Sequence, residues 1–218
     1  FWQSGKTPET CAFFSLFVSL GSNTFCLSTS GGVWMLAQLL ALAFCVWGCF
    51  FWLAGRELPA FFLLALAVGC RPFSALLAVV LFLRPVWSAV RQGRWKHLAA
   101  VSVLPALVAF ALGWYNWARF GNPLEFGHNF LPEFMREENG QFHLEYFWPN
   151  LKNLLRPVLL TETLDLSFPT FNGFLPFLAN PLLLLWLLAL IVGLRKKQLD
   201  WADGILVGCY LLTVVVLC

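Results

Sequence analysis

The chain is organised as long apolar segments separated by short polar connections. Six such segments can be placed to within a few residues, at about 11–27, 33–54, 58–83, 98–118, 175–194 and 204–218. A helix needs about 20 apolar residues to cross the hydrocarbon core of a membrane. The segments 33–54, 98–118 and 175–194 therefore predict membrane-spanning helices. Segment 11–27 is weaker, since Gly21, Ser22 and Asn23 lie near its end.

Composition supports this interpretation of the pattern. The 218 residues are 60% hydrophobic and only 11% charged, whereas a soluble domain is about 25% charged. The apolar runs are long rather than alternating ten-residue segments, which favours helices over a membrane β-barrel. We therefore predict an all-α fold: a polytopic transmembrane helical bundle in an integral membrane protein.

The placement of basic residues predicts the orientation of this bundle. Four of them crowd the connection 84–97, and Arg195, Lys196 and Lys197 follow the segment 175–194. The positive-inside rule assigns both connections to the cytoplasm. Segment 98–118 then runs outward, and the stretch 119–174 is extracytoplasmic.

Segment 58–83 is interrupted at 69–72 by Gly-Cys-Arg-Pro. Proline removes a backbone donor, and a charge is costly in lipid. We favour two short half-helices, 59–69 and 73–83, in a hairpin with Arg71 at its tip; a single span is the alternative. The chain then divides into transmembrane helices over 1–118, an extracytoplasmic loop element over 119–174, and further transmembrane helices over 175–218.

The outer stretch 119–174 is more than a spacer. Connections of this length are commonly functional or disordered, but this one is rich in aromatic residues. It also holds seven acidic residues against four basic ones, Arg119, Arg136, Lys152 and Arg156. Residues 149–157 predict a short helix lying on the membrane surface. We expect a folded element that covers the helix ends.

Sequence motifs for catalysis and metal binding are absent. There is no HExxH, GxSxG or P-loop pattern, the seven cysteines form no CxxC pair, and the three histidines lack metal spacing. The sequence has no stripe of basic residues interleaved with aromatic ones, so it does not indicate a nucleic-acid partner. We predict no cofactor for the chain.

The candidate substrate-binding residues are consequently polar side chains near the outer face. An intramembrane charge such as Arg71 is a functional candidate by default, with a structural helix-tip cap as the alternative. Guanidinium groups can hold a phosphate, and carboxylates can act as acid, base or metal ligand. For each loop residue alone, a solvated or salt-bridged role is the simpler interpretation. The candidates are Arg71, Arg119, Glu125, His128, Arg136 and Arg156.

Several stretches resemble a known family. YNWARFGNPLEFGHNFLPEF, NLKNLLRP, FPTFNGF and LANP, together with AGRELPAFFLLALAVGCRPFSALL, are similar to bacterial multi-spanning proteins related to the family 39 glycosyltransferases of the GT-C fold. The likeness covers nearly the whole chain. It implies a bacterial plasma-membrane protein that transfers a sugar from a polyprenyl-phosphate donor on the non-cytoplasmic face.

The resemblance carries over only in part. It implies that Arg71, Arg119, Arg136 and Arg156 contact the donor phosphate. Glu125 is a candidate to assist them, but it matches no motif of the family that would assign it as the base. The family's acidic residue lies after a first helix that has no counterpart here, so no catalytic base is assigned, and a divalent metal stays open for the full-length protein. Both ends of the chain look cut, so we expect a fragment that is inactive by itself.

Two other functions stay open at this stage. A transporter or flippase also uses broken helices and intramembrane charges, although the middles of 98–118 and 175–194 hold almost no polar residues. A non-catalytic membrane scaffold is the second alternative. Membrane lipids are partners in all three.

Overall fold

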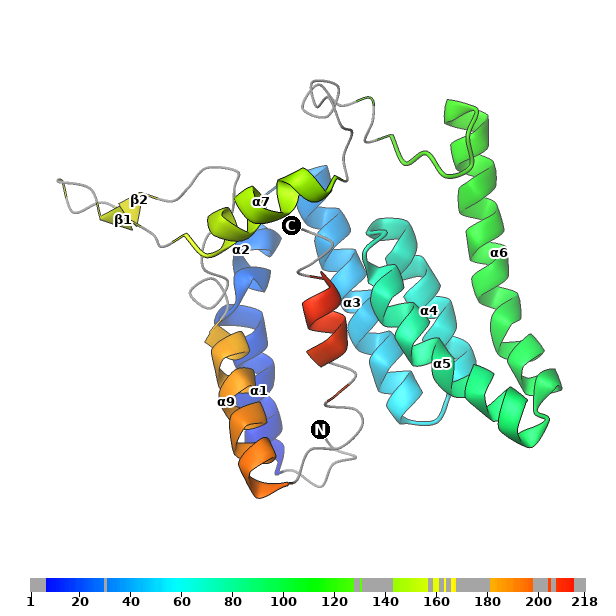
Figure 1. Ribbon diagram of the computed structural model, residues 1–218, viewed down its shortest axis with the longest axis horizontal. Coiled ribbons are helices and arrows are strands. Elements are labelled where there is room, and N and C mark those ends of the chain that lie inside the picture. The colour runs from blue at the N-terminus through cyan, green and yellow to red at the C-terminus, as the bar shows by residue number, and fades with distance from the viewer. Residues whose placement is uncertain are drawn as a thin grey trace. The chain divides into compact units, whose positions relative to one another are not determined.

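The computed structural model of the chain is helical (Figure 1). It divides into two compact units, with unit 1 formed by Phe1–Leu36, Glu145–Gly208 and Val214–Cys218 and unit 2 by Ala37–Leu144 and Cys209–Thr213. The structure describes residues 7–29, 31–127, 130, 143–156, 159–160, 163, 166–167, 181–197, 204 and 207–213.

Unit 1 contains short elements. Helix α1 (Pro8–Leu20) begins where Thr7 caps it, and ends at Gly21, whose N–H donates to the Phe17 carbonyl. Helix α2 (Asn23–Thr29) follows, so the weak segment 11–27 is two helices with a break at the glycine, where the sequence predicted its weakness.

The described part of the outer stretch in unit 1 is also made of short elements. A turn of 3-10 helix, η3 (Leu144–Tyr146), leads into α7 (Phe147–Leu154), close to the short helix predicted at 149–157. The strands β1 (Leu159–Leu160) and β2 (Leu166–Ser167) pair antiparallel, and the sequence did not predict them. Helix α9 (Pro181–Lys196) overlaps the predicted segment 175–194, whose first six residues lie outside the described ones.

Unit 2 contains four consecutive helices joined by tight turns, and its segment Cys209–Thr213 is also helical. The four are α3 (Val33–Leu53), α4 (Glu57–Cys70), α5 (Ser74–Gln92) and α6 (Trp95–Phe120). Short turns make sequential helices antiparallel, so α4 and α6 run in the same direction. Side-chain contacts agree: Glu57 contacts His97 near the start of both helices, and Gly69, near the end of α4, lies against Leu112 of α6.

The core of unit 2 surrounds α4. Ala60, Phe61, Leu64 and Ala67 of this helix are all 3% exposed or less. Gly48 of α3 allows the close approach, because a Cβ there would lie 2.9 Å from Leu64 Cγ. The core cluster is completed by residues of α3, α5 and α6, namely Trp52, Leu81 and Val101.

Among the residues that the structure describes, three helices, α3, α5 and α6, are long and apolar enough to cross a membrane. Their 21, 19 and 26 residues correspond to about 28–39 Å at 1.5 Å per residue, against about 30 Å of hydrocarbon. The 14 residues of α4 span only about 21 Å. Length and composition therefore place the chain among helical integral membrane proteins.

The interval 57–92 differs in one respect from its predicted form. A turn at 71–73 divides it, but the second helix continues to Gln92 instead of ending near residue 83. Pro85 lies inside this helix and is buried, and Gly93 ends it with a left-handed backbone whose N–H donates to Ala89. Most of the expected polar connection 84–97 is therefore helical, because its basic residues are themselves good helix formers.

Candidate functional site

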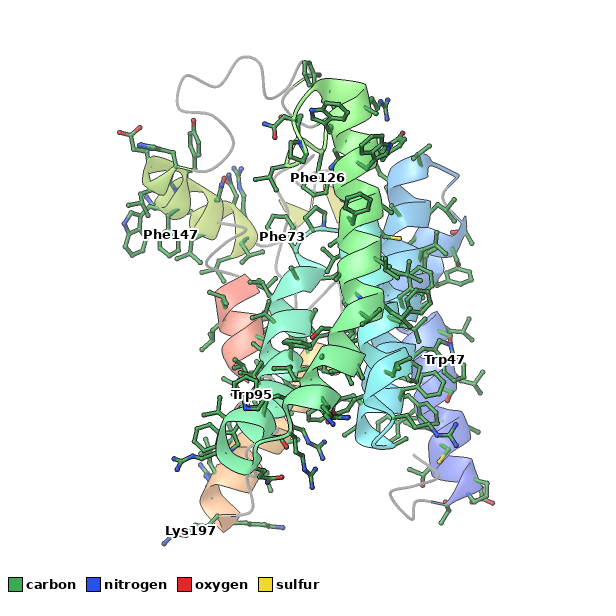
Figure 2. The ribbon with its side chains drawn as sticks, turned by 90° about the vertical axis from the view of Figure 1, so that its right-hand side faces the viewer. Trp47, Phe73, Trp95, Phe126, Phe147 and Lys197 are labelled. Carbon is green, nitrogen blue, oxygen red and sulfur yellow. The ribbon has the colours of Figure 1, made fainter. Side chains whose placement is uncertain are left out.

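Unit 2 has two polar ends. The Glu57 end carries the starts of α4 and α6, and the Arg71 end carries the α4–α5 turn, beyond which the longer helix α6 continues to Phe120 (Figure 1). Figure 2 labels Trp95 towards the first end and Phe73 and Phe126 towards the second. Since α4 and α6 are parallel, Arg71 and Arg119 both lie towards the second end of the unit, with Arg119 further along because α6 has 26 residues and α4 has 14.

The two arginines also share a side of α6. Leu112, Asn116 and Arg119 are spaced i, i+4 and i+7, so they lie on one face of the helix. Leu112 is the residue that α4 covers through Gly69. Arg119 thus projects from the face that α4 covers lower down, and a helical side chain leans back towards the helix start. The α4–α5 turn that carries Arg71 begins directly after Cys70, where α4 ends.

The residues after α6 fold back onto the helix. Gly121 ends α6 in a left-handed conformation, with its N–H donating to the Trp117 carbonyl. The Asn116 side chain is 5% exposed and donates through Nδ2 to the Pro123 carbonyl at 3.2 Å. The Phe120 and Phe130 rings stack with centroids 5.4 Å apart. The loop therefore returns to the level of Asn116 and covers it.

Arg119 is exposed and is held from one side. Its Nη1 donates to the Tyr115 hydroxyl at 3.0 Å, and its guanidinium lies 5.0 Å from the centre of the Phe120 ring. A guanidinium has five N–H donors, and this hydrogen bond uses one of them. The aromatic contacts orient the cation without neutralising it.

An apolar groove runs along the face of α6 that is turned away from Leu112, Asn116 and Arg119. It is shallow, with a volume of about 240 Å³, and is lined by Phe110, Gly113, Trp114, Trp117 and Pro123. Trp114 is 60% exposed and Trp117 is 53% exposed. Exposed tryptophans at a helix end are typical of the membrane interface.

The other predicted site residues lie in the loop after α6, in unit 1 or outside the described part of the chain. Glu125 lies in the loop, where its Oε1 accepts a 2.7 Å hydrogen bond from the Gly127 N–H, so at least one oxygen has a local structural role. Arg156 follows α7 in unit 1 and is exposed. His128 and Arg136 lie outside the described residues. The structure thus brings Arg71 and Arg119 to one end of unit 2.

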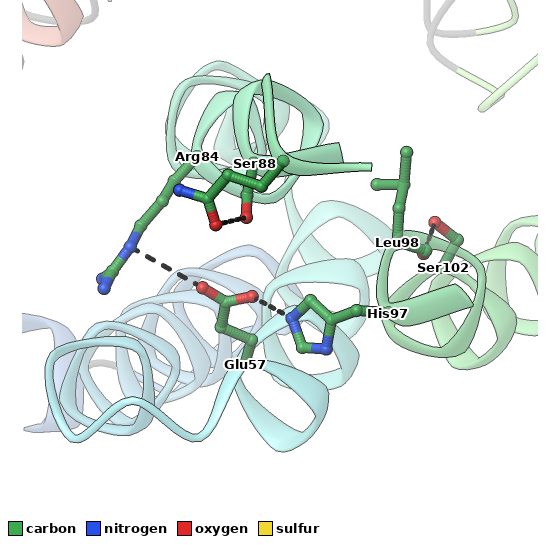
Figure 3. Close-up of polar contacts among 7 residues, drawn as sticks. Glu57, Arg84, Ser88, His97, Leu98 and Ser102 are labelled. Atoms are coloured by element: carbon green, nitrogen blue, oxygen red, sulfur yellow. Dashed lines mark hydrogen bonds and ion pairs between the residues drawn. The ribbon is translucent and has the colours of Figure 1, made fainter. Parts of the chain in front are cut away.

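The Glu57 end holds a cluster that the sequence reasoning missed (Figure 3). Glu57 Oε2 lies 2.7 Å from His97 Nε2, and its Oε1 lies 3.7 Å from Arg84 Nε. The Arg84 guanidinium in turn lies 5.0 Å from the centre of the Trp52 ring. One carboxylate therefore connects α4, α5 and α6, and Arg84 extends the cluster to α3.

A signal for this cluster was present in the sequence. Glu57 is the sole acidic residue between Glu9 and Glu125. Its side chain is only 11% exposed, while those of Arg84 and His97 are about half exposed. A carboxylate retained alone in so apolar a stretch indicates a specific partner, because an unpaired charge there would be costly.

Comparison of the chain with protein-family models, curated proteins and solved structures finds no match. The resemblance to family 39 glycosyltransferases therefore stays a prediction. Among the described residues, no group of three or more His, Cys, Asp or Glu side chains is arranged to hold a metal ion. The class that the fold defines is a helical integral membrane protein, and Arg71, Arg119 and the exposed tryptophans of α6 form its candidate site.

Proposed function

We propose that this protein belongs to a membrane glycosyltransferase and that the Arg71 end binds a polyprenyl-phosphate sugar donor at the non-cytoplasmic face. The observation that carries the proposal is the arrangement of Arg71 and Arg119. Both lie towards the same end of unit 2 and on the same side of α6, and the last three turns of α6 also carry the groove residues Phe110, Trp114 and Trp117.

A lipid-linked donor has a phosphate at the membrane interface and a hydrocarbon tail in the bilayer. Guanidinium groups bind phosphate through charge-assisted and often bidentate hydrogen bonds. Burial of an isoprenoid tail against aromatic side chains contributes through loss of apolar surface to water. The Arg71 end offers both chemistries within a few turns of one helix.

The pattern of burial disfavours transport as the main function. Among the described residues, Asn116 is the one buried polar or charged side chain. It lies near the Arg71 end and is covered by the loop after α6, through its hydrogen bond to Pro123. A transporter needs polar side chains near the middle of the membrane for its substrate. The middle of unit 2 is instead filled by Leu64, Leu81 and their apolar neighbours.

Binding of a polyprenyl phosphate tests the proposal directly. The full 218-residue chain, reconstituted in phosphatidylcholine nanodiscs, is mixed with a polyprenyl phosphate or with the matching polyprenol, and the bound lipid is measured by native mass spectrometry. We expect tighter binding of the phosphate. Arg71→Gln and Arg119→Gln each weaken that binding about 10- to 100-fold, as expected for loss of a charge-assisted hydrogen bond.

Arg195→Gln is the matched control, since it removes one positive charge from the end of α9 in unit 1. It is expected to leave binding unchanged. Equal binding of polyprenol and polyprenyl phosphate would refute the phosphate site. Unchanged binding in both the Arg71 and Arg119 variants would refute its location.

A further inference from the structure

The Glu57 end carries more positive charge than the cluster around Glu57 can neutralise. Within the described part of unit 2 the carboxylates are Glu57 and Glu125, and Glu125 follows α6 at the other end. Glu57 is already engaged by Arg84 and His97. Arg56, Arg91, Arg94 and Lys96 at this end are all exposed.

Two of these cations, Arg94 and Lys96, lie at the start of α6, where a positive charge destabilises the helix. Arg94 is the N-cap residue of α6 and makes no capping hydrogen bond through its side chain, and Lys96 lies in the first turn, which holds no acidic residue. The start of a helix carries a partial positive charge, so cations there are destabilising. An anion bound beside Arg94 and Lys96 would remove this repulsion.

Aromatic side chains place the same surface at the membrane interface. Trp87 is 61% exposed and Trp95 is 59% exposed. The Arg91 guanidinium lies 4.6 Å from the centre of the Trp87 ring. Exposed tryptophans favour the headgroup level of the bilayer, so Arg91 is held beside the phosphates of the lipid leaflet.

We infer that Arg91, Arg94 and Lys96 form a binding surface for anionic phospholipid headgroups, in the leaflet at the Glu57 end. Each basic residue close to an anionic leaflet contributes about fivefold to binding. The surface is separate from the proposed donor site, because it lies at the opposite end of unit 2. Its ligand is the phosphate of a diacyl lipid within the bilayer, and neither arginine of the donor site takes part.

The test compares lipids retained by the intact chain. The protein is extracted from vesicles of equal parts phosphatidylglycerol and phosphatidylcholine, and the ratio of the two bound lipids is measured by native mass spectrometry. We expect a preference for phosphatidylglycerol. Arg91→Gln/Arg94→Gln/Lys96→Gln lowers it at least about tenfold, which allows for partial screening of the three charges.

Two further variants and one change of conditions separate this surface from a general charge effect. Arg195→Gln/Lys196→Gln/Lys197→Gln removes the same number of charges from the end of α9 and is expected to keep most of the preference. Arg91→Lys/Arg94→Lys keeps the charges and the preference. For the parent chain, the preference is expected to fall as salt is raised.

An unchanged preference in the Arg91, Arg94 and Lys96 variant would overturn the inference. An equal loss in the α9 variant would also overturn it, because the effect would then follow net charge alone. Should the triple variant fail to fold, a salt-independent preference in the parent chain is the contradicting result. The donor-binding experiment has its own ligand and variants, so either proposal can fail without the other.

Discussion

The two ends of unit 2 hold their arginines in different ways. At the Glu57 end, Arg84 lies between a carboxylate and the Trp52 ring, above a core in which Ala60 and Leu64 are fully buried. At the Arg71 end, Arg119 is exposed and is held by the Tyr115 hydroxyl and the Phe120 ring. The first arrangement neutralises a cation, whereas the second only orients one.

This difference separates stability from binding. A neutralised cation in a packed cluster fixes the helices relative to each other, while an oriented and exposed cation keeps its capacity to bind an anion. The packed half of unit 2 can therefore serve as a rigid support for the proposed ligand site, which is what precise binding geometry requires. The comparison predicts that substitutions near Glu57 change stability and that substitutions near Arg119 change binding.

The largest effect on stability is expected from the core around α4. Leu64→Ala removes a side chain that is 0% exposed, and such cavities cost about 2–5 kcal/mol. Leu124→Ala, in the loop at the Arg71 end, is the control because Leu124 is 80% exposed. Unfolding by SDS in mixed micelles measures both. Equal destabilisation would show that the core is not centred on Leu64.

Substitution of two glycines by alanine is expected to change stability in different directions in the two halves of unit 2. A Cβ at Gly48 would lie 2.9 Å from Leu64 Cγ, in the packed half of the unit, whereas a Cβ at Gly113 would lie 3.7 Å from Pro123. Gly48→Ala is expected to destabilise the protein by about 1–3 kcal/mol through overpacking. Gly113→Ala is expected to be neutral or to stabilise it by up to about 1 kcal/mol through helix propensity. The same SDS titration measures the stability of both variants. Stabilisation by Gly48→Ala would contradict the close approach of α3 and α4.

The smallest difference in stability is expected between variants of Glu57 and Glu125, the two carboxylates in the described part of unit 2. Glu57→Gln weakens the contacts to His97 and Arg84, and we expect a loss of about 1–2 kcal/mol because both partners are half exposed to solvent. Glu125→Gln keeps an oxygen that can accept from the Gly127 N–H, so its effect should lie within about 0.5 kcal/mol. Thermal unfolding in detergent compares them, and a larger loss for Glu125→Gln would reverse the assignment of roles.

Much of the fold follows from the apolar pattern, but the extent of the helices does not. The segments 33–54 and 98–118 correspond to α3 and α6, because an apolar run of that length has few other structures. The extension of α5 to Gln92 was missed, since basic residues after an apolar run were interpreted as a connection. Arginine and glutamine are good helix formers, and the left-handed Gly93 is the actual end.

The candidate site was predictable only as a set of residue types. The interruption at 69–72 indicated Arg71, and the end of the segment 98–118 indicated Arg119. Their common side of α6 depends on the contact between Gly69 and Leu112, which joins residues far apart in the chain. The Glu57 cluster was missed for the same reason, because His97 is forty residues away along the chain.

Photolabelling with a polyprenyl phosphate tests the central claim most directly. A donor analogue that carries a diazirine in its first isoprene units is bound to the chain in nanodiscs, irradiated, and mapped by peptide mass spectrometry. We expect labelling within residues 110–123, the part of the chain that holds Arg119 and the groove residues Phe110, Trp114 and Trp117. This labelling should be competed by unlabelled polyprenyl phosphate and reduced in Arg119→Gln. Labelling confined to residues 84–97 at the Glu57 end, or labelling that polyprenol competes equally well, would contradict it.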